Sequence, residues 1–202
     1  MKLAAVIAVV AWSFALLGCE STPKTAAPQI TTEVAAASVD AKAARVDFRL
    51  SGRITDVSDG DTLTLAGASG STTIRMSDMD TPEVSHGSSR PGQRFGRAAE
   101  ASLKSMAPVG TSAQAECYER DQYNRAVCTV FVGSRNLNLE QIERGWGMLP
   151  DNPDWIRDPQ SQLAQARAKQ QRRGVWQDAN PQTPASWRYR CWQLRQCAGA
   201  EQ

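Results

Sequence analysis

The stretch "DGDTLTLAGASGSTTIRMSDMDTPE", residues 59–83, places five carboxylates and one arginine among β-branched and apolar residues. The runs "TLTL" and "STTIRM" are rich in β-branched residues and predict two strands joined by a turn at "AGASG". Five carboxylates lie at or near the ends of these strands: Asp59, Asp61, Asp78, Asp80 and Glu83. A solvated hairpin scatters its charges, whereas a turn here would gather them. The stretch therefore predicts a strand pair that carries a cluster of acidic groups.

The chain outside this stretch predicts a small barrel with helices. Residue alternation predicts strands over 46–57, 111–119 and 125–133, in addition to the two strands above. Helical periodicity is present over 92–106, 136–145 and 161–174. Five strands interrupted by a helix after the third predict an α+β fold, a five-stranded OB-fold β-barrel with three α-helices. The pattern alone leaves another small α+β domain as the alternative.

The helical segments also predict which residues face the core. The first segment places Phe95, Ala99, Leu103 and Met106 on one apolar stripe. In the second, Asn138 is the expected N-cap, with Gln141 three residues on. In the third, Leu163 and Ala166 are expected to face inward.

The N-terminal region predicts export. Residues 1–18 combine a positive start with a short apolar run, as secretory signal peptides do. The ending "LLGC" resembles a bacterial lipobox, in which Cys19 is lipidated and becomes the mature N-terminus; an ordinary signal peptide with a chance cysteine is the alternative. Residues 19–45 lack aromatics and predict a disordered tether. The protein is expected to be exported and held in the cell envelope by its lipid anchor, in the outer membrane or periplasm if the cell is Gram-negative. The alternative is a secreted protein. Palmitate labelling that survives in a Cys19→Ser variant would contradict the lipidation.

The cysteines favour two local disulfides over a zinc-type site, and the net charge is not that of a strongly basic protein. The four cysteines other than Cys19 allow three disulfide connectivities in an exported chain, and the local pairs Cys117–Cys128 and Cys191–Cys197 are favoured. A zinc-type site is disfavoured because the chain has one histidine, His86, and no Cys-x-x-Cys pair. The net charge of +2 gives no overall basic field of the kind that many nucleic-acid-binding proteins have.

The residue types at the strand ends fit a cation and a phosphate. If the strands at 62–65 and 71–76 pair, Asp61 and Asp80 can converge beside the carbonyl of Thr81. Hard oxygen ligands without histidine or cysteine suit Ca²⁺, although Asp-Gly and Asp-Thr-Pro are also common turn formers. Arg75 and Arg125 carry planar guanidinium groups that match phosphate oxygens, although for either arginine taken alone an ion pair with a neighbouring aspartate is the favoured interpretation.

These residues resemble the staphylococcal nuclease (thermonuclease) family, which consists of secreted, Ca²⁺-dependent nucleases built on an OB-fold. The resemblance covers about Arg53 to Trp176 and rests on six motifs in the family's order: "DGDTLTL", "IRMSDMDTPE", "GQRFGRAAEA", "DQYNRAV", "NLNLEQIERGWG" and "AQARAKQQRRGVW". The domain is expected over 46–180, followed by a tail at 181–202.

The resemblance implies a role for each site residue. It implies that Asp61, Asp80 and the Thr81 carbonyl hold one Ca²⁺ ion, with Asp59 as a supporting carboxylate. It implies Glu83 as the catalytic base and Arg75 and Arg125 as phosphate-binding residues. The implied reaction is hydrolysis of DNA or RNA that leaves 5′-hydroxyl and 3′-phosphate ends. The sequence leaves open whether internal bonds or ends are cut, with an endonuclease favoured, and a monomer is the default expectation.

The chain departs from the family pattern at several positions. Asn124 stands where the family usually has glycine, and asparagine tolerates the left-handed conformation that such a turn needs. Tyr123 matches a position near the bound nucleotide, and Trp155 could serve as a stacking platform or only pack. His86 is expected to be a surface residue. The tail segment "ASWRYRCWQLRQC" could contact nucleic acid or cover the barrel.

Three functions fit the sequence. The first is an exported, membrane-tethered nuclease acting on DNA or RNA. The second is a non-catalytic OB-fold module of the cell envelope that binds nucleic acid or a protein partner. The third, a structural envelope lipoprotein, leaves the carboxylate cluster unexplained. Because every acidic and arginine residue of the family's site is retained, the sequence favours the enzyme.

Overall fold

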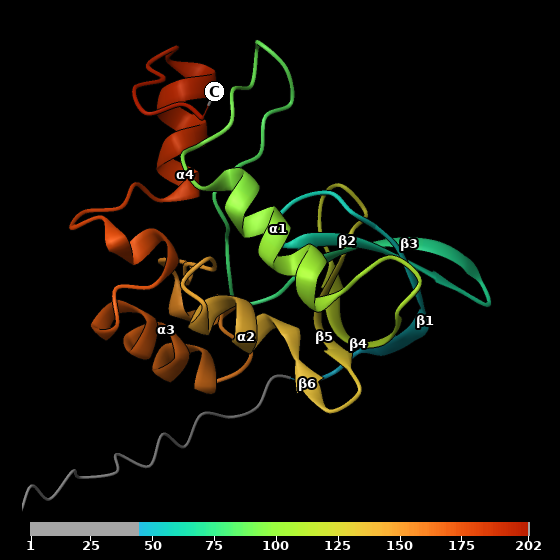
Figure 1. Cartoon of the computed structure of the whole chain (residues 1–202). Coiled ribbons are helices and arrows are strands. Elements are labelled where there is room, and N and C mark those ends of the chain that lie inside the picture. The colour runs from blue at the N-terminus through green and yellow to red at the C-terminus, as the bar shows by residue number, and fades with distance from the viewer. Residues whose placement is uncertain (1–44, 202) are drawn as a thin grey trace, which may run out of the picture. The chain divides into compact units, whose positions relative to one another are not determined.

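Five strands form a closed barrel in the computed structural model, which describes residues 45–201 (Figure 1). The barrel strands are β1 (Phe48–Val57), β2 (Thr62–Gly67), β3 (Gly70–Met76), β4 (Ser112–Arg120) and β5 (Ala126–Val132). Neighbours in the order β3-β2-β1-β4-β5 pair antiparallel, and β3 closes the barrel by pairing in parallel with β5. A two-residue strand, β6 (Arg135–Asn136), extends β5. The predicted α+β OB-fold barrel is confirmed. The predicted signal peptide, Cys19 and all but the last residue of the predicted tether lie outside the described residues.

The register of β2 and β3 explains how the barrel positions charged groups at one end. Leu63 pairs with Ile74, and both side chains are buried in the core. Side chains alternate along a strand, so the next pair, Thr62 and Arg75, lies on the other side of the strands. The acidic turns directly before β2 and after β3 therefore meet near Arg75.

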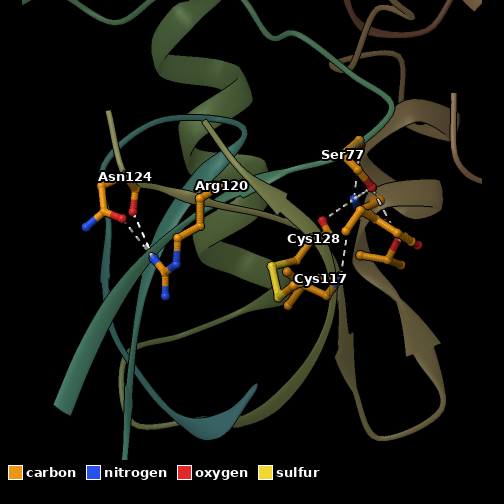
Figure 2. Close-up of a disulfide and its surroundings, with 9 residues drawn as sticks. Ser77, Cys117, Arg120, Asn124 and Cys128 are labelled. Atoms are coloured by element: carbon orange, nitrogen blue, oxygen red, sulfur yellow. Dashed lines mark hydrogen bonds between the residues drawn. A yellow bond between two sulfur atoms is a disulfide. The ribbon is translucent and has the colours of Figure 1, made fainter. Parts of the chain in front are cut away.

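The Cys117–Cys128 disulfide links β4 to β5 inside the barrel core. In Figure 2 the bond appears between Ser77 and Arg120, and the Arg120 guanidinium donates to the Asn124 carbonyl in the β4–β5 turn at 3.0 Å. The two cysteines are register partners with Cα atoms 4.0 Å apart, and both are fully buried. A second disulfide joins Cys191 to Cys197 in the tail. Both of the favoured local pairings are formed.

Within the part of the chain that the structure describes, four α-helices and three further helical turns accompany the barrel. The helices are α1 (Gly96–Met106), α2 (Leu137–Glu143), α3 (Gln160–Gln170) and α4 (Pro184–Trp187). The turns are the 3₁₀-helices η1 (Pro153–Trp155) and η2 (Gly174–Gln177) and the π-helical turn η3 (Arg188–Gln193), which continues α4. The stripe predicted for α1 is confirmed, since Ala99, Leu103 and Met106 are buried and Phe95, just before the helix, is half-buried. The fourth helix was not predicted. Within residues 45–201, no helix combines the length and the apolar character needed to cross a bilayer.

The N-cap predicted for α2 was wrong. Asn136 caps the helix, because its side chain accepts a hydrogen bond from the Leu139 amide at 3.1 Å. The backbone leaves β6 at Asn136 in an extended conformation, so the helix begins before Asn138. Asn138 is buried and instead bonds across the structure, to the Ser77 and Cys128 carbonyls at 3.0 and 3.1 Å.

The inward face predicted for α3 was also wrong. Leu163 and Ala166 are exposed, whereas Ser161, Ala164 and Ala168 face the interior. The Ser161 hydroxyl donates to buried Asp78 at 2.9 Å, and this bond fixes the rotation of the helix. Ala164 and Ala168, three and seven positions after Ser161, then lie on the same face of the helix and point inward as well.

Candidate active site

The first acidic turn, Asp59-Gly60-Asp61, is locked between helices α1 and α2. The Gln141 side-chain amide donates to the carbonyls of Gly60 and Ala99, both at 2.9 Å. A Cβ on Gly60 would lie 2.7 Å from both the Thr81 hydroxyl and the Ala99 Cβ, so this close approach requires glycine. Gln141, predicted as part of a helix cap, thus holds the turn that carries Asp61.

The second acidic turn, Asp80 to Glu83, is fixed by backbone contacts. Asp80 forms a two-way backbone bridge with Met148, at 2.8 and 2.9 Å. The Thr81 amide donates to Asp61 Oδ2 at 3.0 Å, and this bond joins the two turns. The Glu83 carbonyl accepts from the Gln93 amide at 2.8 Å and lies so close to Gly96 that a Cβ there would be 2.2 Å away. Helix α1 therefore positions Glu83 through its first residue.

Arg75 brings the two turns to a common point. Its guanidinium donates through Nη1 to Asp61 Oδ1 at 2.9 Å and through Nη2 to Asp80 Oδ1 at 2.7 Å. Asp59 accepts from the Asp61 amide at 2.9 Å and so lies directly beside the pair. The structure thus brings together Asp59, Asp61, Asp80 and Arg75, as the sequence led us to expect.

Asp78 is not part of this cluster. Its carboxylate accepts from the amides of Arg157 and Asp158 at 2.8 and 2.7 Å, and from the Ser161 hydroxyl. A left-handed backbone conformation at Asp78 (φ 67°) accompanies this arrangement. Of the five carboxylates in residues 59–83, Asp78 is therefore the one that binds the segment leading into α3 and does not face the site.

Burial makes the carboxylate charges costly. Asp61 is 2% exposed, and desolvation raises its pKa to about 7 although the Arg75 guanidinium opposes the shift. Burial likewise raises the pKa of Asp59 and of Glu83. At Asp80 burial also favours the neutral form, but ion pairs with Arg188 and Arg75 outweigh it, and the net pKa is lowered. Crowded carboxylates in such a setting favour a bound cation.

Arg125 lies in the site but apart from the carboxylate cluster. Its Nε donates to Asp121 Oδ2 at 2.7 Å, and the preceding Asn124 adopts the predicted left-handed conformation (φ 62°). Tyr123 is exposed, with the Arg125 guanidinium 5.5 Å from its ring centre. Arg125 is thus held at the rim by an ion pair of its own.

Two adjoining cavities receive these side chains. The first has a volume of about 530 Å³ and is lined by most of the predicted site residues: Asp59, Asp61, Arg75, Thr81, Glu83, Tyr123 and Arg125. The second, of about 760 Å³, is lined by Asp80 and by Trp155, whose side chain is exposed. Both cavities are lined by Arg75, Tyr123 and Arg125. Trp155 lines only the second cavity and therefore lies beside the first, which holds most of the predicted site residues. His86 is exposed and lines the first cavity.

Arg188, in the tail, is a site residue that sequence reasoning missed. Its Nη2 donates to Asp80 Oδ2 at 2.7 Å, and its Nη1 donates to Asp80 Oδ1 at 3.2 Å and to Glu83 Oε1. Trp192 follows one turn later and lines the first cavity with it. Both residues lie beyond the six motifs, and only the concentration of tryptophan and arginine in the tail hinted at a contact.

The donor set fits a hard cation. Asp61, Asp80 and the Thr81 carbonyl offer only oxygen atoms, the ligands that Ca²⁺ takes. Over residues 45–201, no three side chains of Asp, Glu, His or Cys are arranged as a ready-made ion site. A cation held here would therefore rely on two carboxylates, a carbonyl and water.

Comparisons with known proteins place the chain in a family. Residues 73–178, more than half of the chain, match the family model described as "Staphylococcal nuclease homologue". An Escherichia coli protein called "Uncharacterized endonuclease" is 30% identical over 140 residues, which cover 69% of this chain and 85% of that protein. A Haemophilus influenzae protein of the same description is 31% identical over 67% of this chain and 71% of its own length. The "Micrococcal nuclease" of Shigella flexneri is 27% identical over 70% of this chain and 81% of its own. The chain belongs to the staphylococcal nuclease family.

Proposed function

We propose that this protein is a calcium-dependent nuclease that hydrolyses phosphodiester bonds within DNA or RNA. The observation that carries the proposal is the convergence of Asp61 and Asp80 on one guanidinium group, that of Arg75, with Glu83 lining the same cavity. Family membership and relatives described as endonucleases support it further.

Asp61, Asp80 and the Thr81 carbonyl would hold the calcium ion. When bound there, calcium supplies a Lewis acid that polarises the phosphate and orients water. Asp59, which accepts from the Asp61 amide, keeps the carboxylate of Asp61 in place beside Arg75.

The protein's own residues bind the phosphate and move the proton. Arg75 and Arg125 bind phosphate oxygens and stabilise the charge that builds up on them in the transition state. Glu83 accepts a proton from the attacking water, whose oxygen forms the new bond to phosphorus. The raised pKa of Glu83 makes it a stronger base than a solvated carboxylate.

The bond that breaks joins phosphorus to the 5′ oxygen. That oxygen takes up a proton from solvent water and leaves as the 5′-hydroxyl, the phosphate stays on the 3′ side, and Glu83 returns the proton that it accepted to the solvent. The proposed products are therefore 5′-hydroxyl and 3′-phosphate ends. The exposed Tyr123 and Trp155, beside the two cavities, offer stacking surfaces for the bases of a flexible strand, so we propose cleavage within chains.

Removal of calcium is expected to stop the reaction. Purified protein should cleave circular single-stranded DNA, which has no ends, in calcium, and should lose at least about 10²-fold in rate in a calcium-specific chelator. Restored cleavage after added calcium is the control for damage by the chelator. Undiminished turnover in chelator would contradict the calcium assignment. Binding of DNA without cleavage under every divalent metal would instead favour the non-catalytic binding module.

A further inference from the structure

The tail places a third guanidinium group on the residues proposed for cation binding and catalysis. Arg188 engages both carboxylate oxygens of Asp80 and one of Glu83. Arg75 and Arg188 also donate to the same atom, Asp80 Oδ1, at 2.7 and 3.2 Å. Two guanidinium forks thus converge on one oxygen, and both arginines line both cavities.

The backbone that carries Arg188 is firmly held. Trp187, directly before it, is buried, and its indole N–H donates to the Pro91 carbonyl at 3.2 Å. Trp192 donates to the same carbonyl at 3.0 Å, and the Cys191–Cys197 disulfide closes the turn that follows Arg188. The tail is therefore fixed to the loop after Glu83, and the Arg188 side chain can change partners without movement of its backbone.

Arg188 and a bound cation would compete for Asp80. In the structure both oxygens of Asp80 accept hydrogen bonds from arginines. A divalent ion bound to one of these oxygens would repel a guanidinium held on the same carboxylate. The Arg188 side chain would then face the two cavities that it lines, together with Arg75, Tyr123 and Arg125.

A substrate phosphate could accept the hydrogen bonds that Arg188 now donates to Asp80 and Glu83. Guanidinium groups form two parallel hydrogen bonds with phosphate as readily as with carboxylate. We propose that Arg188 is a further phosphate-binding residue, which pairs with Asp80 and Glu83 before substrate binds and turns to a substrate phosphate when a cation takes Asp80. This inference rests on the proposed function.

The test uses two readouts that should move in opposite directions. The variants are Arg188→Ala and Arg188→Gln, which retains length without charge, and the control is Arg190→Ala, an exposed arginine on the same turn. Calorimetric titration with calcium alone should give about ten-fold tighter binding in both Arg188 variants, because a competing ion pair is gone. Cleavage of a single-stranded DNA oligonucleotide at saturating calcium should show a KM raised about ten-fold, because a phosphate contact is lost. The control should match the wild type in both.

Each outcome bears on the proposal. A merely structural role for Arg188 would weaken both calcium and substrate binding, and that result would overturn it. Unchanged calcium affinity, or an unchanged KM, in both variants would overturn it as well. A wild-type protein that binds calcium but cleaves no nucleic acid would refute the proposed function, while the calcium titration would still show whether Arg188 competes for Asp80. A wild-type protein that binds no calcium would overturn both.

Discussion

Replacement of Glu83 by glutamine is expected to lower kcat about 10²- to 10⁴-fold, the usual contribution of a general base. Glutamine has nearly the same shape and can still accept the hydrogen bond from Arg188, but it cannot take a proton from water. The fold should be retained, since the Glu83 contacts that order the turn are made by its backbone, to Gln93 and against Gly96. The measurement is kcat on single-stranded DNA at saturating calcium, with thermal unfolding in parallel.

Glu116→Gln is the matched control for this prediction. Glu116 pairs with Arg49 on the surface of the barrel, between strands β4 and β1. The Glu116→Gln substitution should leave kcat unchanged, because Glu116 lines neither cavity. Near wild-type turnover in Glu83→Gln would show that another group accepts the proton.

Replacement of Arg75 by alanine is expected to lower kcat/KM about 10²- to 10³-fold, as the loss of a transition-state donor does. It should also destabilise the fold by about 1–3 kcal/mol, because Asp61 loses its hydrogen-bonded counter-charge and is then buried as a neutral carboxyl group with an unpaired oxygen. Arg75→Lys separates the two effects: it keeps the charge beside Asp61 but loses the two-pronged contact, so stability should recover more than activity does. Steady-state kinetics and denaturant unfolding give the two quantities.

Arg49→Ala is the control for the arginine series. Arg49 is largely exposed and pairs with Glu116, so its loss should change stability by no more than about 1 kcal/mol and leave kcat/KM unchanged. Full activity in Arg75→Ala would contradict its assignment to the phosphate.

The barrel and the acidic cluster could be predicted because local patterns determine both. Alternation along the strands sets which side chains face the core, and the pairing of Thr62 with Arg75 then brings the flanking turns together. Residue type alone could not show that one of the five carboxylates, Asp78, points away from the acidic cluster. Asp78 and Asp80 are two positions apart, yet a left-handed backbone at Asp78 directs its carboxylate to α3.

Long-range contacts explain what the sequence did not reveal. The rotation of α3 depends on the bond between Ser161 and Asp78, which are 83 residues apart. The role of Gln141 depends on Gly60, which is 81 residues away. Arg188 meets Asp80 across 108 residues from a segment outside the family motifs, so no spacing rule pointed to it.

A crystal structure of the Glu83→Gln variant grown with calcium tests the central claim most directly. We predict one calcium ion at about 2.3–2.6 Å from oxygens of both Asp61 and Asp80, with the Arg188 guanidinium displaced from Asp80. A calcium ion bound elsewhere, with Asp61 and Asp80 still held by Arg75 and Arg188 alone, would contradict the account.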